Sequence, residues 1–123
     1  MSQTILVVDD SPTVVKFVAL SLRTKGYNIL TACDGMDAIE KISNSADPVD
    51  LIITDLNMPN LDGYGLIETL RQNNAHLETP IIILSSEEDD DDRQRGIDVG
   101  ASSYLVKPFK PVSLLTEIGK YLS

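Results

Sequence analysis

The sequence predicts an α/β domain built on a doubly wound parallel sheet with helices on both faces. Five short apolar runs alternate with five amphipathic segments along the whole chain. Runs of four or five apolar residues bounded by turn residues are typical of strands buried in a parallel sheet. Their alternation with helices favours strand–helix–strand crossovers that cover both faces of one sheet. No linker or repeat divides the chain, which predicts one domain over residues 1–123.

The first strand and helix carry clear start and stop signals. An apolar strand is expected at 4–8. Ser11 is a good helix cap, and Pro12 suits the first helical position because proline lacks the N–H that would be unsatisfied there. Apolar residues then recur at helical spacing as far as Gly26, which is expected to end the helix.

The second and third strands are each followed by an aspartate that is expected to cap a helix. The strands are predicted at 28–32 and 51–54. Asp34 follows the second strand and Asp62 follows the third, and a carboxylate at either position can accept hydrogen bonds from the exposed N–H groups of a helix start.

The last third of the chain contains the strand that we expect at the centre of the sheet. The run at 81–84 is the most continuously apolar, and a fifth strand is expected at 102–106. The helix between them, at about 89–99, has little apolar surface, and Gly96 costs about 1 kcal/mol relative to alanine. We therefore expect this helix to be the most mobile element. A final amphipathic helix is expected to begin at Pro111.

Composition argues against several classes of function. The formal net charge of −9 disfavours direct nucleic-acid binding, which needs cations to neutralise phosphates. No apolar run approaches the roughly 18 residues of a membrane span, and the first strand begins too early for a signal peptide. The single cysteine, Cys33, is expected in a buried strand, and the single histidine, His76, in an exposed loop. We expect a cytoplasmic protein without a nucleic-acid or membrane partner.

Charged residues follow three of the predicted strands. Asp9 and Asp10 close the first strand, Asp55 follows the third, and Lys107 ends the fifth. Ligands of open α/β sheets bind outside the carboxyl ends of the strands, so these side chains are expected to meet on one rim. Crowded carboxylates raise one another's pKa unless a cation lies among them. The pattern therefore predicts a hard divalent metal, for which Mg²⁺ is the natural choice.

The set of residues at the strand ends resembles the signature of response-regulator receiver domains. The matching positions are Asp9, Asp10, Asp55, Ser85, Lys107 and Pro108. Each is weak evidence alone, but their order and their places at strand ends form a specific signal. The resemblance covers essentially the whole chain and is strongest to single-domain chemotaxis regulators. It implies a flavodoxin-like fold with strand order 2-1-3-4-5.

The resemblance implies a role for each residue at the acidic rim. Asp55 would accept a phosphoryl group from a phosphohistidine on a histidine kinase or a histidine phosphotransfer protein. Asp10 would bind Mg²⁺ directly, and Asp9 would act through a metal-bound water. Asn57 would contribute its backbone carbonyl, and one oxygen of Asp55 would complete the protein ligands.

The resemblance also implies a switch. Lys107 would neutralise charge on the phosphoryl oxygens, aimed by a cis peptide bond to Pro108. Ser85 would donate a hydrogen bond to a phosphoryl oxygen and so move inward. Tyr104 would then rotate beneath the fourth helix and remodel the face of helix four, strand five and helix five for an effector protein.

Two further positions bear on the lifetime of the phosphorylated state. In the family, the positions that correspond to Asn57 and Glu87 flank the path of the water that hydrolyses the acyl phosphate. Their identities here imply self-dephosphorylation within seconds to minutes. The acidic run at 87–92 is expected to be mainly a solvated helix start that favours the helix dipole, although it could also select basic partner surfaces.

Each position also has a bland explanation when it is taken alone. Asp10 could be a turn residue and Ser85 a helix cap. Tyr104 could be a half-buried tyrosine on an edge strand, and Glu87 an acid placed to suit the helix dipole. Taken together, the positions favour a functional site.

Alternative functions make different demands on the sequence. A haloacid-dehalogenase-type phosphatase, which also uses Mg²⁺ and an aspartyl phosphate, needs Asp-x-Asp after the first strand, where this chain has Asp9-Asp10-Ser11. A flavodoxin-like cofactor binder needs a Ser-, Thr- and Gly-rich phosphate loop there. A degenerate receiver would act by protein contact alone. We expect a monomer that catalyses only its own phosphotransfer and dephosphorylation and is not otherwise an enzyme. Whether it acts alone or within a longer protein stays open.

Overall fold

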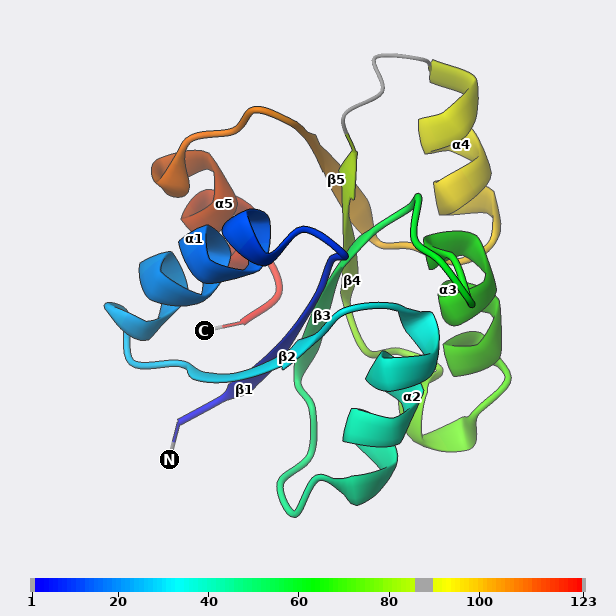
Figure 1. Cartoon of the computed structure of the whole chain (residues 1–123), viewed down its shortest axis with the longest axis horizontal. Helices are drawn as coiled ribbons and strands as arrows, with labels where there is room; N and C mark the ends of the chain where they lie inside the picture. Colours follow the sequence, from blue (N-terminus) through cyan, green and yellow to red (C-terminus); the bar gives the residue numbers. More distant parts are fainter. Residues whose placement is uncertain (1, 86–89, 123) are drawn as a thin grey trace.

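The computed structural model describes residues 2–85 and 90–122, and its centre is one parallel five-stranded sheet (Figure 1). The strands are β1 (Thr4–Val8), β2 (Asn28–Ala32), β3 (Leu51–Asp55), β4 (Ile81–Ser85) and β5 (Ser103–Val106). Their order is β2-β1-β3-β4-β5, and every neighbouring pair is parallel. The predicted fold class and strand order are therefore confirmed.

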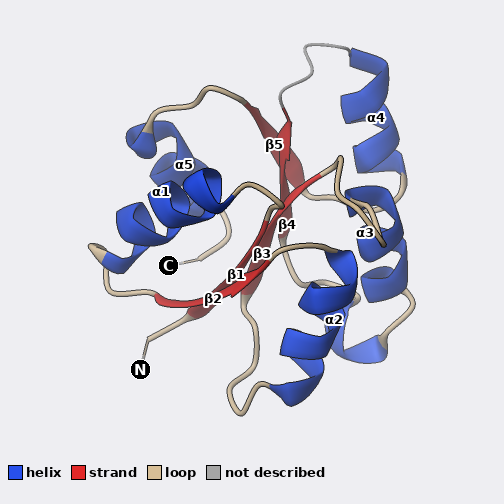
Figure 2. Cartoon of the chain, in the orientation of Figure 1, coloured by secondary structure: helices blue, strands red, loops and turns tan. Residues whose placement is uncertain are grey.

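Helices cover both faces of the sheet (Figure 2). They are α1 (Pro12–Arg23), α2 (Gly35–Asn44), α3 (Gly63–Arg71), α4 (Asp90–Asp98) and α5 (Pro111–Gly119), with a short 3-10 helix η1 (Asn74–His76). Helices α1 and α5 lie on one face, and α2, α3 and α4 lie on the other. Each face has its own hydrophobic core: in β1, Ile5 and Val7 pack toward α1 and α5, whereas Leu6 and Val8 pack toward the opposite layer. This alternation follows from the two-residue period of a strand.

The predicted caps start their helices as expected. The hydroxyl of Ser11 accepts a hydrogen bond from the Val14 amide at 3.4 Å, and Pro12 occupies the first helical position. The Asp34 carboxylate accepts from the Asp37 amide at 2.8 Å. The equivalent bond at α3 runs from the Gly65 amide to Asp62, also at 2.8 Å. These short-range bonds place the helix starts directly after the strand ends.

The expectation that the fourth strand is central is wrong. Strand β3 occupies the middle of the sheet, and β4 lies between β3 and the edge strand β5. All five residues of β4 are buried, as in β1 and β3. Continuous apolarity reports that both faces of a strand are covered, which holds for every inner strand. It does not report the strand's position along the sheet.

Two single residues are also placed differently from the prediction. Cys33 lies just beyond the end of β2 and is exposed, so it is not a core residue. His76 is buried in η1 rather than exposed in a loop, with only 9% of its surface accessible. Its Nδ1 lies 3.1 Å from the Thr79 hydroxyl, and Arg71 donates a hydrogen bond to its backbone carbonyl. The polar residues around His76 in the sequence do not indicate that Arg71, through its hydrogen bond to the His76 carbonyl, holds this segment against the domain.

Helix α4 buries little apolar surface, as the sequence predicts. Of residues 91–98, only Gly96 is buried, while Ile97 packs partly buried against the core. A Cβ atom on Gly96 would lie 2.3 Å from Cδ1 of Ile83 in β4. This glycine therefore allows helix α4 to approach the sheet closely. Its low helix propensity alone does not indicate this packing role. The mobility of α4 stays a prediction.

In the described part of the chain, the structure contains no helix with both the length and the apolarity needed to cross a bilayer.

Candidate functional site

Three carboxylates gather at the carboxyl ends of β1 and β3. Asp9, Asp10 and Asp55 each offer an oxygen, and these oxygens all lie within 4.8 Å of one another. The pairing of β1 with β3, which aligns Val8 with Thr54, brings the two strand ends to the same level. The predicted acidic rim is thus present in the structure.

Asp9 is the most deeply held of the three acids, with 2% of its surface accessible. One of its oxygens accepts a hydrogen bond from the Ser11 amide at 2.9 Å. The other accepts from Nζ of Lys107, also at 2.9 Å. Both oxygens are therefore engaged, which fixes the side chain between the start of α1 and the end of β5.

Lys107 connects the two sides of the rim. Besides its bond to Asp9, its Nζ lies 3.6 Å from Oδ1 of Asp55. Its backbone amide donates to the carbonyl of Ser85 at 2.6 Å, and its peptide bond to Pro108 is cis, as the resemblance implies. The ammonium thus contacts carboxylates at the ends of two strands. The nearer carboxylate in space, that of Asp9, is 98 residues away in the sequence.

Asp55 lies at the end of β3 with 8% of its surface accessible. Burial raises the pKa of its carboxyl above the ordinary value, and the charges of Asp9 and Asp10 raise it further. Lys107 and the Leu56 amide, which donates to Oδ1 at 2.9 Å, act in the opposite direction. The net shift of the pKa is upward because burial and the neighbouring acids outweigh the effects of Lys107 and the Leu56 amide.

The donor set fits a hard divalent cation. Carboxylate oxygens are the ligands that Mg²⁺ prefers, and three carboxylates with one ammonium leave two formal negative charges to be balanced. One divalent ion among these oxygens would balance that charge and oppose the effect of Asp9 and Asp10 on the pKa of Asp55. The acids and the ammonium of this chain therefore suit Mg²⁺.

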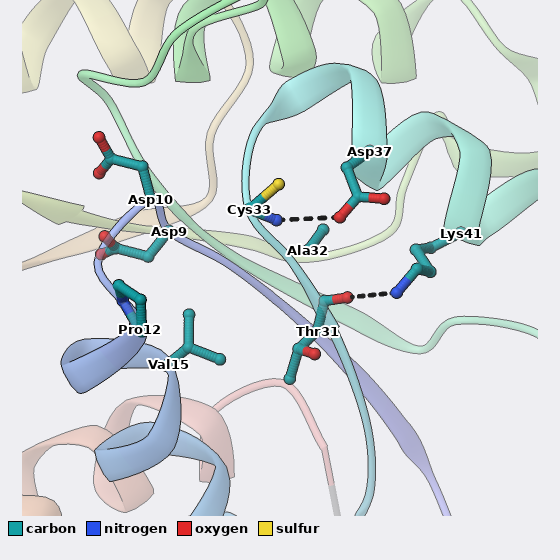
Figure 3. A pocket seen from close by; sticks show the side chains of 9 residues that line it. All are labelled: Asp9, Asp10, Pro12, Val15, Thr31, Ala32, Cys33, Asp37 and Lys41. Atoms are coloured by element: carbon teal, nitrogen blue, oxygen red, sulfur yellow. Dashed lines mark hydrogen bonds between the residues drawn. The ribbon is translucent and has the colours of Figure 1, made fainter.

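A small cavity opens beside the acidic rim (Figure 3). It has a volume of about 230 Å³ and is bordered by Asp9 and Asp10 on one side and by Cys33, Asp37 and Lys41 on the other. The Lys41 ammonium donates to the Thr31 carbonyl at 3.0 Å, and the Asp37 carboxylate accepts from the Cys33 amide, also at 3.0 Å. Solvent and small ions can therefore reach the two acids from the side of α2.

The remaining predicted residues surround the rim at different depths. Ser85 is buried at the end of β4, opposite Val106 of β5. Asn57 has an exposed side chain in the loop after β3. Tyr104 on β5 is 42% exposed, and the Arg93 guanidinium lies 5.1 Å from its ring centroid. Glu87 lies outside the described residues.

One contact between two loops at the carboxyl end of the sheet is not predicted by the sequence. The side-chain amide of Asn60 donates to Oδ2 of Asp34 at 2.7 Å, joining the β3–α3 loop to the start of α2. Asp34 was predicted only as a helix cap. The available signal was Asn60 itself, because asparagine is one of the few residues that tolerate the left-handed conformation it adopts here, with φ of 66°.

Comparisons with known proteins agree with this geometry. The profile of the response regulator receiver domain family matches residues 5–119. Protein PilG of Pseudomonas aeruginosa is 38% identical over 114 residues, which cover 93% of this chain and 83% of PilG. A protein named as the probable transcriptional regulator ycf27 of Cyanidium caldarium is 37% identical over 96% of this chain. This chain spans only 45% of the length of that relative.

Solved structures show the same fold at close similarity. The chemotaxis protein CheY4 of Vibrio cholerae superimposes with a TM-score of 0.92 at 35% identity, covering 99% of this chain and 100% of CheY4. The receiver domain of the sensor histidine kinase PA1611 of Pseudomonas aeruginosa gives a TM-score of 0.88 at 30% identity, with 98% of each chain covered. That structure holds a magnesium ion coordinated in its active-site cleft.

Proposed function

Because this chain belongs to the family of response-regulator receiver domains, which act in two-component signalling, we propose that it accepts a phosphoryl group on Asp55. The donor is a phosphohistidine on a histidine kinase or a histidine phosphotransfer protein. The observation that carries the proposal is the position of Lys107, whose ammonium lies 2.9 Å from Asp9 and 3.6 Å from Asp55. A cation held between two acids at a strand end suits the binding of an incoming phosphoryl group.

The transfer is a displacement at phosphorus. A carboxylate oxygen of Asp55 forms the new O–P bond as the N–P bond of the phosphohistidine breaks, and the imidazole leaves with the electron pair of that bond. Lys107 lies where it can bind phosphoryl oxygens while their charge redistributes. The Ser85 hydroxyl, at the end of the neighbouring strand β4, is the second group proposed to bind a phosphoryl oxygen.

Asp10, Asp55 and the backbone carbonyl of Asn57 are proposed to hold Mg²⁺, with Asp9 acting through water. When bound, the ion supplies positive charge that stabilises the transferring phosphoryl group. The three acids of this chain offer their oxygens within 4.8 Å of one another, which supports the assignment. The magnesium in the cleft of the PA1611 receiver domain supports it further.

The output is proposed to be a change in the face formed by α4, β5 and α5. The inward movement of Ser85 toward the phosphoryl group would create space for Tyr104, a residue that is 42% exposed. That ring now lies against Arg93 of α4, so its rotation would alter a contact between β5 and α4. An effector protein that binds the changed face would stabilise the phosphorylated packing.

The phosphodonor protein is proposed to approach the side of the domain formed by α1 and α5. These two helices and their flanking turns are formed by residues 11–26 and 107–122. They contain six of the ten Lys and Arg residues of the chain but only one of its nineteen Asp and Glu residues. An apolar groove of about 570 Å³ lies between them, bordered by Phe17 and Phe109, and Lys107 reaches from the groove to the rim. A partner with an acidic, partly apolar surface fits this side.

The phosphorylated state is proposed to be short-lived, with Asn57 and Glu87 governing access of water to the acyl phosphate. The protein catalyses these reactions only on itself and has no separate substrate. Chemotaxis is one system in which it could act, supported by the similarity to the chemotaxis protein CheY4. A transcriptional output is the alternative if the chain is part of a longer protein, as the names of the longer relatives suggest.

Intact mass measurement after incubation with Mg²⁺ and acetyl phosphate tests the reaction. We expect one added phosphoryl group on the native chain and none on Asp55→Asn or in the presence of EDTA. Addition to both proteins would refute Asp55 as the acceptor. No addition to the native chain, with acetyl phosphate or with a phosphorylated histidine kinase, would favour a degenerate receiver that acts only by protein contact.

A further inference from the structure

We propose that the hydrogen bond between Asp34 and Asn60 positions the β3–α3 loop, residues 56–62, for metal binding at the acidic rim. The inference rests on the proposed function, in which the carbonyl of Asn57 in this loop is a ligand of Mg²⁺. Asp34 and Asn60 touch neither the metal nor the phosphoryl group, so they act as positioning residues.

The contact joins two elements that are far apart in the sequence. Asp34 follows β2 and is buried, with 7% of its surface accessible. Its Oδ1 accepts from the Asp37 amide at 2.8 Å, and its Oδ2 accepts from Nδ2 of Asn60 at 2.7 Å. The same two bonds lower the pKa of its carboxyl, so the acid stays charged and its hydrogen bonds are charge-assisted. One carboxylate thus starts α2 and holds the loop.

The backbone of the loop is shaped to make this contact. Asn60 adopts a left-handed conformation with φ of 66°, and the adjacent Leu61 amide donates to the Pro59 carbonyl at 2.8 Å. The Leu61 carbonyl in turn accepts from the Gly35 amide at 3.0 Å. A Cβ atom on Gly35 would lie 2.5 Å from that carbonyl oxygen, so only glycine allows the approach. Loop and helix start therefore meet through two adjacent residues on each side.

The first residue of the loop, Leu56, is fixed both to Asp55 and to the start of α3. The Leu56 amide donates to the Asp55 carboxylate, and the Leu56 carbonyl accepts from the Gly63 amide at the start of α3, each at 2.9 Å. Asn57 lies between two fixed residues of the loop, Leu56 and Asn60, and has an exposed side chain. Among the described residues, the bond to Asp34 is the side-chain hydrogen bond that joins this stretch to the start of α2. Its loss should free the carbonyl of Asn57 to move.

Four variants separate the effect of the bond from the effects of charge and of backbone conformation. Asp34→Ser keeps a good helix cap but lacks the second oxygen, which accepts from Asn60, and so removes the bond. Asn60→Gly removes it while retaining access to the left-handed conformation. The double variant Asp34→Asn/Asn60→Asp restores a bond with donor and acceptor exchanged, at unchanged net charge. Asp37→Asn removes one charge from the cavity beside Asp9 and Asp10 without touching the loop, and it serves as the charge control.

Two measurements on the full chain decide the question. The first is the Mg²⁺ dissociation constant by isothermal titration calorimetry. We expect it to rise about tenfold in both single variants, as is typical when support for a metal ligand is lost, and to recover in the double variant. The second is amide hydrogen exchange of residues 56–62 without metal. We expect faster exchange in the single variants and native rates in the double variant.

The outcomes distinguish this inference from the proposed function. Failure of the native chain to bind Mg²⁺ would overturn the proposed function, and this inference with it. Native binding with unchanged affinity in Asp34→Ser and Asn60→Gly would overturn only the positioning role. That role is also overturned if Asp37→Asn weakens binding as much as Asp34→Ser, because charge alone would then explain the loss.

Discussion

The guanidinium of Arg95 on α4 lies over the ring of Tyr64 on α3, with its Cζ atom 4.0 Å from the ring centroid. The Tyr64 hydroxyl also donates to the backbone carbonyl of Asp92 at 3.2 Å, so one buried tyrosine contacts α4 at two points. Cation–π contacts contribute about 0.5–1 kcal/mol when exposed and more when desolvated. In a helix that buries so little apolar surface, these contacts are a substantial part of what holds it in place.

Replacing Tyr64 should therefore loosen α4 more than any other element. In Tyr64→Leu, we expect faster amide exchange across residues 91–98, since both contacts are lost. Tyr64→Phe is the matched control: it keeps the ring beneath Arg95 and loses only the hydroxyl bond, so its effect should be smaller. Exchange in native α4 as slow as in α5 would contradict the expected mobility of this helix.

Gly96 should resist substitution although alanine is the better helix former. A Cβ atom at this position would lie 2.3 Å from Cδ1 of Ile83, so the side chain or the helix must shift. We expect Gly96→Ala to lower the free energy of unfolding by about 1–3 kcal/mol, the usual cost of overpacking. A Cβ atom on Gly119 in α5 would meet open space, so Gly119→Ala should be neutral or stabilising in the same denaturant titration.

Asp55→Asn should stabilise the metal-free protein at neutral pH. The pKa of Asp55 is raised above the ordinary 3.8, chiefly by burial, so the folded state favours the protonated acid and loses stability as the pH rises above that value. We expect a gain of about 1 kcal/mol in the free energy of unfolding, a common size for stabilising changes. Asp47→Asn, at an exposed acid in the loop before β3, is the control and should show little gain.

Addition of Mg²⁺ should reverse that order. An ion that binds only the folded state stabilises it by about 2.7 kcal/mol at a hundredfold excess over its dissociation constant. Thermal denaturation should show this gain in the native chain and in Asp47→Asn, with little in Asp55→Asn. Equal stabilisation of all three proteins would place the metal elsewhere.

His76 should make the protein less stable below neutral pH. Its pKa is lowered from the ordinary 6.5, first by burial and then by the charge of Arg71. The folded state therefore favours the neutral ring, and stability is lost as the pH falls from 6.5 through the lowered pKa. As the single histidine of the chain, its imidazole resonances can be followed directly by NMR. Titration at or above 6.5 would contradict this placement.

His76→Gln should weaken that pH dependence. Denaturant titrations between pH 7 and 5 are best compared in the Asp55→Asn background, because the raised pKa of Asp55 makes stability depend on pH with the opposite sign. A pH dependence unchanged by the histidine substitution would assign the effect to other groups.

Charge reversal on α1 should slow phosphorylation by a protein donor. Lys16 and Arg23 are exposed and form no ion pair within the described residues. In Lys16→Glu/Arg23→Glu, transfer from a phosphorylated histidine kinase should fall by roughly tenfold or more, in line with electrostatically steered association. The rate with acetyl phosphate should not change, because a small donor needs no docking surface. A loss with both donors would indicate damage to the site instead.

Much of this protein follows from local patterns in its sequence. Apolar runs and capping residues identify the strands and helix starts, because the strand period and cap hydrogen bonds involve residues only a few positions apart. The parallel topology then brings Asp9, Asp10, Asp55 and Lys107 to one rim, since the carboxyl ends of parallel strands share an edge. The strand order came from the resemblance alone, and apolarity by itself pointed to the wrong central strand.

Tertiary structure decided the contacts between distant segments. The Lys107 ammonium lies closer to Asp9 than to Asp55, and Asp34 is hydrogen-bonded to Asn60. His76 is buried and Cys33 is exposed. Each of these depends on how helices and loops from different parts of the chain pack to within about an ångström. Side-chain identity and spacing encode which local structures form, whereas such contacts arise only when those structures are packed together.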